Sequence, residues 1–255
     1  MIVASIKAPE QLGKLVGSPG ETLTATLKRT ITEMILFGFF AQDARLYPHE
    51  LALRFDVSAT PVREALMQLT MEGLIEATPR RGFHIRTPTQ AQIADLWHVR
   101  LGLELTAVEG VIARLGSGAM AVSDIQALAS IQARRDEFGV RMTTKQHIET
   151  NAAFHHKLVE LSGNRLLMNI FGSIHMQLIG AWVQRGVESW RARLTEDAQE
   201  HHAIIDALKA RDVEQCRIVM RRHVGRSLQG ALDDLAAQLD AKSRLTEINE
   251  QGGST

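Results

Sequence analysis

The segment from Pro48 to Leu66, PHELALRFDVSATPVREAL, contains two helix starts separated by only a few residues. Pro48 can open a helix because the first helical position needs no backbone N–H, and the HELALRF run supplies apolar side chains for one face. The DVS sequence predicts a tight turn. Thr60 is then predicted to cap a second helix that starts at Pro61. Two short helices joined in this way are typical of a helix-turn-helix.

The residues on either side complete a small domain. From Glu21 to Ile35, apolar residues recur at helical spacing, which predicts a further helix. After the helix-turn-helix, LIEATPRRGFHIRT contains two short β-prone runs around PRRG, which predicts a hairpin. We therefore predict an N-terminal arm over residues 1–20 and a winged helix-turn-helix domain over residues 21–87, with Pro88 at its boundary.

The rest of the chain has no run of alternating polarity. Residues 89–238 have the pattern of successive helices. They are divided into about six segments by breaks at Gly116-Ser117-Gly118, Gly139, Ser162-Gly163 and Gly186. Residues 239–255 form a tail whose last residues, NEQGGST, are predicted to fray. The predicted fold class is mainly α: an N-terminal winged helix-turn-helix followed by a C-terminal all-helical bundle.

Composition limits the classes of partner and compartment. The 255 residues include 29 basic and 29 acidic residues, so bulk charge does not indicate a polyanionic partner, although a local basic patch is still possible. The single cysteine, Cys216, cannot form an internal disulfide, which fits a reducing compartment. The longest apolar run, Met34 to Phe40, is too short to cross a bilayer, and the N-terminus does not resemble an export signal. We expect a soluble cytoplasmic protein.

The start of the third helix carries side chains suited to DNA. Arg63 can make a bidentate contact with guanine, and the hydroxyl groups of Ser58 and Thr60 can bind phosphates. The alternative is that Arg63 is a solvated helix residue paired with an acid. Because these side chains occur together with the turn and with the basic wing described next, we favour double-stranded DNA as the partner.

The predicted hairpin is locally basic. Arg80 and Arg81 lie at its tip beside Gly82, Arg86 follows, and residues 78–87 contain no acid. A positive tip of this kind suits the DNA backbone or the minor groove. The wing is therefore a second candidate contact with DNA.

Arg100 and Glu104 fall on the apolar face of the helix that starts near Ala91. A buried charge is costly unless it is paired or used. In one interpretation the two residues form an i,i+4 ion pair. In the other, Arg100 reaches into a pocket and binds an anionic effector.

Three histidines lie on the apolar faces of three separate predicted helices. They are His155, His201 and His223, and Asn151 precedes His155 by one helical turn. Singly, each is more often a hydrogen-bonded core histidine than a ligand. Together, imidazole ligands and an oxygen donor suit zinc or another divalent first-row metal, with nickel and manganese as alternatives. His156 and His202 point away from these faces and are expected on the surface.

The stretch LALRFDVSATPVREALMQLTMEGLIEATPRRGFHIR resembles the winged helix-turn-helix of the GntR family of bacterial transcription regulators. The resemblance implies that the third helix and the tip of the wing touch an operator. The positions that match family contact residues are His49, Ser58, Thr60, Arg63 and Gly82. Family members usually have an arginine where this chain has Ala59, so their operator preference does not transfer directly.

Residues 89–238 resemble the FCD domain of the FadR-type branch of the same family, through NAAFHHKLVELSGNRLL, HHAIIDALKARD and MRRHV. In metal-binding members an aspartate and three histidines hold a divalent cation below the effector. This resemblance implies that His155, His201 and His223 are ligands, with Asn151 in place of the aspartate. Arg100 matches an arginine placed to meet an effector carboxylate.

The sequence thus predicts a homodimeric, non-enzymatic regulator, acting as a repressor, whose operator affinity is controlled by a small organic acid bound at a metal-containing pocket. A metal-dependent hydrolase is the alternative, because three histidines with an open site can activate water. It is disfavoured because no Glu or Asp stands beside the histidines at the spacing of a catalytic motif, as an obvious general base would. A third possibility is that the histidines are merely structural.

Overall fold

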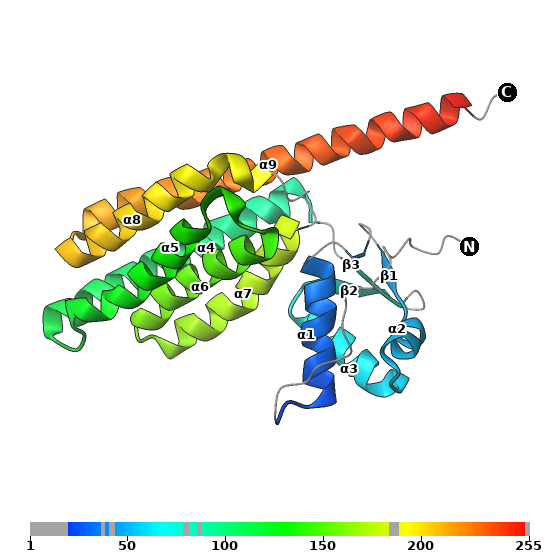
Figure 1. The fold of residues 1–255 in the computed structure, drawn as a ribbon, viewed down its shortest axis with the longest axis horizontal. Coiled ribbons are helices and arrows are strands. Elements are labelled where there is room, and N and C mark those ends of the chain that lie inside the picture. Colours follow the sequence, from blue (N-terminus) through cyan, green and yellow to red (C-terminus); the bar gives the residue numbers. More distant parts are fainter. Residues whose placement is uncertain are drawn as a thin grey trace. The chain divides into compact units, whose positions relative to one another are not determined.

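The computed structural model describes residues 20–36, 39–40, 44–78, 82–85, 88–183 and 189–252. It divides into two compact units (Figure 1). The first consists of residues 1–88 with 176–184, and the second consists of residues 89–175 with 185–255. Each unit is described separately.

The first unit contains three helices, α1 (Leu23–Leu36), α2 (Pro48–Phe55) and α3 (Ala59–Met71). Asp56 ends α2 in the left-handed conformation, which produces the tight turn before α3. The predicted cap was wrong by two residues. Ser58, with φ −73° and ψ 158°, is the N-cap of α3, so Thr60 and Pro61 lie inside its first turn. Proline is tolerated there because the first four helical N–H groups have no intrahelical acceptor.

The wing has one more strand than the sequence predicts. The strands β1 (Arg45–Leu46), β2 (Ile75–Thr78) and β3 (Gly82–Ile85) form an antiparallel sheet in the order β1-β3-β2. β2 and β3 form the predicted hairpin, with Thr78 opposite Gly82. The segment before α2 looked like a plain connection because β1 has only two residues, too few to show alternation.

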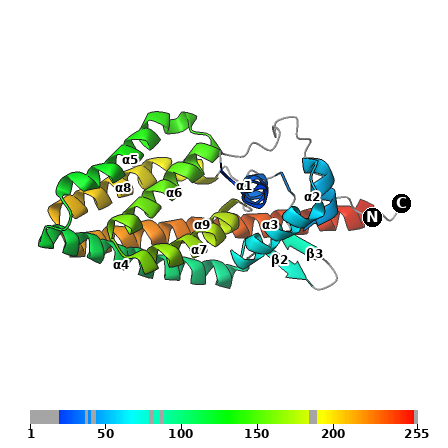
Figure 2. The ribbon, with the colours of Figure 1, turned by 90° about the horizontal axis from the view of Figure 1, so that it is seen from below.

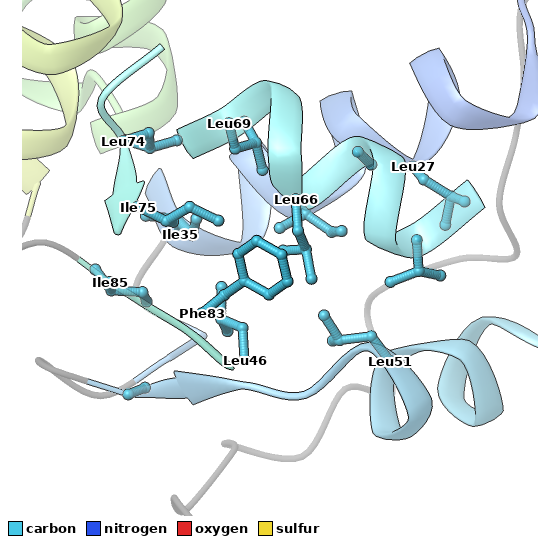
Figure 3. Packing of buried hydrophobic residues seen from close by; sticks show 14 of the residues in the cluster. Leu27, Ile35, Leu46, Leu51, Leu66, Leu69, Leu74, Ile75, Phe83 and Ile85 are labelled. Carbon is cyan, nitrogen blue, oxygen red and sulfur yellow. The ribbon is translucent and has the colours of Figure 1, made fainter. Parts of the chain in front are cut away.

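An apolar core fixes the three helices on this sheet. Leu27 and Ile31 of α1 and Leu66 and Leu69 of α3 are fully buried. Phe83 of β3 lies between Leu66 and Leu46 (Figure 3). Ala59 packs partly against the same core.

The second unit is helical. Its α-helices are α4 (Gln90–Ser117), α5 (Gln126–Phe138), α6 (Thr144–Leu161), α7 (Arg165–Val183), α8 (Leu194–Ala210) and α9 (Val213–Gly252). Short 3-10 turns occur at Val122–Ile125, Gly139–Arg141 and Ser189–Arg193. Helices α4, α5 and α6 end near Gly118, Gly139 and Gly163, which all have positive φ, so these three predicted breaks are confirmed. The break predicted at Gly186 lies outside the described residues.

Packing brings five of these helices together. α4 packs against α6 and α9, and α8 packs against α5 and α9 (Figure 1 and Figure 2). Capping boxes fix the starts of α4 and α6. The pairs are Thr89 with Gln92 and Thr143 with Gln146. In each pair the threonine hydroxyl accepts from the glutamine backbone N–H, and the glutamine side-chain oxygen accepts from the threonine backbone N–H.

The C-terminal tail differs from the prediction. α9 continues past Gln238 to Gly252, although NEQGGST is low in apolar residues. Extending a helix that already exists costs little, because each added residue gains a hydrogen bond without a new nucleation step. Within the described part of the chain, none of the helices combines the length and the apolar character needed to cross a membrane.

Candidate metal centre and DNA interface

The three predicted histidines meet in the interior of the helical unit. His155 of α6, His201 of α8 and His223 of α9 are buried, and each offers a ring nitrogen within 4.8 Å of those of the others. The ring centroids of His155 and His201 are 5.3 Å apart, and those of His201 and His223 are 4.8 Å apart. Three helices distant in sequence thus supply one imidazole cluster.

Two of these histidines are oriented by buried carboxylates. His155 Nδ1 lies 2.9 Å from Glu104 Oε2, and His223 Nδ1 lies 3.1 Å from Glu200 Oε2. An ionised carboxylate only accepts, so we assign the proton of each ring to Nδ1. The Nε2 atom of each ring therefore presents a lone pair, the arrangement that second-shell carboxylates give to metal-binding histidines.

His201 is oriented by an amide in the same way. Its Nδ1 lies 2.7 Å from Gln132 Oε1. The orientation of this amide is set because Gln132 Nε2 donates to Asp136 at 2.7 Å. His201 Nδ1 therefore donates to the amide oxygen, and its Nε2, which has no hydrogen-bond partner among the described residues, presents a lone pair.

These nitrogens fit a divalent cation. The Nε2 atoms of His155 and His223 are 3.3 Å apart, close to the separation of about 3.4 Å between two nitrogens bound to one tetrahedral zinc. Two facing lone pairs repel unless a positive charge lies beside them; here Arg100 Nη2 lies 2.8 Å from His155 Nε2, and a bound divalent cation would take that place. Burial lowers the pKa of His155 to about 3, which disfavours a proton as that charge. The donor set suits a metal better than a proton.

The fourth predicted ligand stays a prediction. Asn151 is half-buried on α6, one turn before His155. A second group of possible ligands also lies close, because one ligand atom each of Asp197, Glu200 and His223 falls within 4.8 Å of the others. His223 is shared by both groups.

Arg100 forms the ion pair of the first sequence interpretation, and its contact with an anionic effector stays a prediction. Its Nε donates to Glu104 Oε1 at 2.6 Å, so the i,i+4 pair exists, and both residues are buried. Its Nη2 also lies 2.8 Å from His155 Nε2. Burial alone would raise the pKa of Glu104, but Arg100 and His155 outweigh it and hold this pKa below its usual range. The carboxylate of Glu104 thus stays ionised beside Arg100.

The predicted DNA residues of the first unit lie on its surface. Ser58, Thr60 and Arg63 are exposed at the start of α3, and His49 is exposed at the start of α2. Within the described ranges Arg63 forms no ion pair, so its predicted alternative, pairing with an acid, is not seen there. Gly82 has φ +79°, a conformation that favours glycine. Arg80 and Arg81 lie outside the described residues.

Comparison with known proteins agrees with this two-part architecture. The model of the FCD domain matches residues 95–226, more than half of the chain, and the model described as bacterial regulatory proteins, gntR family, matches residues 23–85. The chain belongs to the GntR family. It is a transcriptional regulator with an FCD domain.

Named relatives of this GntR regulator include the Nta operon transcriptional regulator of Aminobacter aminovorans, 29% identical over 76% of this chain and 87% of the relative. Another is the transcriptional repressor GlaR of Escherichia coli, 25% identical over 77% of this chain and 90% of the relative. The E. coli McbR/YncC structure has the same fold, with a TM-score of 0.69, 22% identity, and coverage of 84% of this chain and 99% of that one.

Sequence reasoning missed part of the GntR regulator's buried polar network. Gln132, Arg135, His147 and Glu200 are all buried beside the histidines. A signal was present: Gln132 and Arg135 follow Leu128 at helical spacing on α5, at positions where a core helix would have apolar residues. His147 likewise precedes Asn151 by one turn of α6.

Two expectations about the surroundings of the cluster were wrong. The sequence shows no acid at catalytic-motif spacing from the histidines, but folding brings Glu104 against His155 and Glu200 against His223; both carboxylates already accept hydrogen bonds from imidazoles. His156 is half-buried and packs edge-on to Phe171, with ring centroids 5.3 Å apart, rather than lying on the surface. His202 is exposed as predicted and pairs with Asp136.

Proposed function

We propose that this GntR regulator represses transcription from an operator and that a small carboxylate, bound at a metal in the FCD domain, relieves repression. The observation that carries the proposal is the set of three buried histidines whose Nε2 lone pairs converge beside Arg100. His155, His201 and His223 would hold the cation, zinc first, with nickel or manganese as alternatives. A bound divalent cation supplies a positive, open coordination position for an anionic ligand.

The chain's own residues would give this site its selectivity. Arg100 can meet a carboxylate with two parallel hydrogen bonds, as guanidinium groups do. Glu104 keeps that guanidinium in place through its contact with Nε. Control of the operator requires that the effector bind more tightly to the DNA-incompetent state of the dimer than to the competent state. Repression is supported by the similarity to GlaR, which is a transcriptional repressor.

Metal analysis tests the first step. Full-length protein purified without a chelator or a nickel column should contain about one divalent ion per chain, measured by mass spectrometry of the metals. His201→Ala should lose the ion because the site needs three imidazoles. His202→Ala is the matched control, because His202 is the next residue but is exposed. Metal-free wild-type protein, or equal retention by both variants, would overturn the site.

Asn151→Asp sharpens the same experiment. An aspartate adds a negative charge where metal-binding relatives have one, so we propose that this variant binds zinc more tightly than the wild type. Competition with a fluorescent zinc chelator measures the difference. Unchanged affinity would place Asn151 outside the ligand set.

Operator binding tests the second step. Mobility-shift titration against a genomic fragment pool should show a sequence-preferring, salt-sensitive complex, because phosphate contacts release counterions. Addition of the effector, found by thermal-shift screening of small carboxylates with and without divalent metals, should weaken that complex. A complex unaffected by any stabilising carboxylate would remove the regulatory part of the proposal. The hydrolase alternative receives no support from the relatives.

A further inference from the structure

Arg135 is a second buried arginine at the histidine cluster, and neither the family resemblance nor the comparisons assign it a role. It lies on α5 with only 2% of its surface exposed. Its Nη2 is 3.3 Å from Asp197 Oδ2 and 3.4 Å from His147 Nδ1. Its Nη1 is 3.1 Å from His201 Nδ1. The guanidinium is therefore enclosed by the same helices that supply the histidines.

The contact with His201 does not satisfy Arg135. Because His201 Nδ1 carries a proton directed to Gln132, it has no lone pair for a second donor. Arg135 Nη1 thus faces an N–H group. Its Nε also has no hydrogen-bond partner in the described part of the chain. Among the described residues, this buried guanidinium with five N–H donors forms one ion pair, with Asp197 at 3.3 Å.

Arg100 shows the opposite arrangement. Its Nε is 2.6 Å from the fully buried Glu104, and its Nη2 meets the lone pair of His155 Nε2. The side chain of Asp197, the counter-ion of Arg135, is 18% exposed. Burial lowers the pKa of Arg135 more than Asp197 and Asp136 raise it. Arg135 is therefore the arginine of this centre whose Nε and Nη1 lack acceptors among the described residues.

A neighbouring side chain adds another unused donor. Trp190 stacks on His147, with ring centroids 4.3 Å apart, and His147 contacts Arg135. Trp190 is buried, and its Nε1–H has no acceptor among the described residues. Buried polar groups without partners are costly and uncommon. Arg135 and Trp190 both contact His147 and each keeps an unused N–H donor, which indicates that an acceptor, preferably an anion, belongs near His147.

We propose that Arg135, assisted by Trp190, binds a second anionic group of the effector, so that the regulator responds to short dicarboxylates rather than to monocarboxylates. The inference rests on the proposed function, in which the first carboxylate binds at the histidines and Arg100. The two arginines contact His155 and His201, whose ring centroids are 5.3 Å apart, so one small molecule can span both. In the absence of such a ligand, the carboxylate of Asp197 accepts a hydrogen bond from Arg135 Nη2.

The test compares diacids with their monoesters. Isothermal titration calorimetry of the full-length, metal-analysed protein would use malonate, succinate, glutarate and adipate, each beside its monomethyl ester. At least one diacid should bind roughly tenfold more tightly than its ester, the effect of one charge-assisted contact. Arg135→Gln should reduce the affinity for that diacid to the affinity for the ester and leave ester binding unchanged. Arg134→Gln is the matched control, because Arg134 is the preceding residue and is exposed.

The outcomes separate the two proposals. Equal binding of diacid and ester to the wild type, or an equal loss of both in Arg135→Gln, overturns the role of Arg135 and leaves the proposed function standing. No binding of any carboxylate overturns the proposed function and this inference with it.

A second variant covers the case in which Arg135→Gln fails to fold. Asp197→Asn removes the carboxylate that competes for Arg135, so the affinity for the diacid should rise several-fold while ester binding stays the same. If Arg135 only stabilises the fold, the loss of its counter-ion gives no such gain. An unchanged or lower diacid affinity in the folded Asp197→Asn protein contradicts the proposal.

Discussion

The two units of this regulator place their polar residues in opposite ways. In the winged helix unit, the cluster that holds the elements together is apolar, and Ser58, Thr60 and Arg63 project from its surface. In the helical unit, arginines, carboxylates and histidines lie inside the bundle and bond to one another. The first arrangement costs little, because water solvates the exposed groups. The second is stable only while each buried charge keeps its partner.

The largest effect should come from breaking a buried pair. Glu104→Ala leaves the guanidinium of Arg100 buried without its carboxylate. The free energy of unfolding of the helical unit should therefore fall by about 3–5 kcal/mol. Urea denaturation followed by circular dichroism measures this change. Glu109→Ala is the control, because Glu109 lies on the same helix as Glu104 but its ion pair with Arg217 is exposed. Its loss should lower the free energy of unfolding by less than about 1 kcal/mol. Similar losses of stability in both variants would show that burial of charged groups does not set the helical unit apart.

Leu66→Ala tests the apolar core of the other unit. Leu66 is fully buried between the helices and the sheet, and its truncation should cost about 2–5 kcal/mol through lost burial and a cavity. Operator binding should fall with it, whereas metal content should not, because the histidines belong to the other unit. Leu53→Ala, at a site 84% exposed on α2, should change neither property. Loss of metal in Leu66→Ala would show that the units depend on each other.

Arg63→Ala should change function without changing stability. Arg63 is exposed, so its removal leaves the core intact, but operator affinity should fall by about 1–3 kcal/mol per contact and base preference should relax at one position of each half-site. Competitive mobility shifts with a randomised operator measure both. Arg134→Ala, an exposed arginine of the helical unit, should leave the sequence preference unaltered. An unchanged preference in Arg63→Ala removes Arg63 from the recognition surface.

The smallest effect concerns pH. Burial, followed by the nearby arginines, lowers the pKa of His147 to about 2, whereas the unfolded value is about 6.5. Below pH 6.5 only the unfolded chain takes up this proton, so its contribution to stability is lost as pH falls, by about 1.4 kcal/mol per pH unit. His147→Phe in metal-free protein should reduce the slope of stability between pH 6.5 and 5 by that amount. His202→Phe, at an exposed histidine, should not.

The polar residues lie on the surface in the winged helix unit and inside the helical unit, and this difference explains how well the sequence predicted each unit. The helix-turn-helix was readable because its turn, helix starts and exposed contact residues lie within one short segment. The errors were local: Ser58 rather than Thr60 caps α3, and β1 is too short to show a pattern. In the helical unit, the three histidines could be found because each interrupts an apolar face.

The sequence by itself determined the two-part helical architecture, the helix breaks at Gly118, Gly139 and Gly163, and the inward direction of His155, His201 and His223, because periodicity and glycine conformation act over a few residues. Only the tertiary structure decided which acceptor orients each imidazole and that Arg135 lies beside His201 with too few acceptors. Those pairings join residues separated by dozens of positions, such as Glu104 with His155. They depend on how α4, α5, α6, α8 and α9 pack, and helical periodicity in one segment carries no information about its partner.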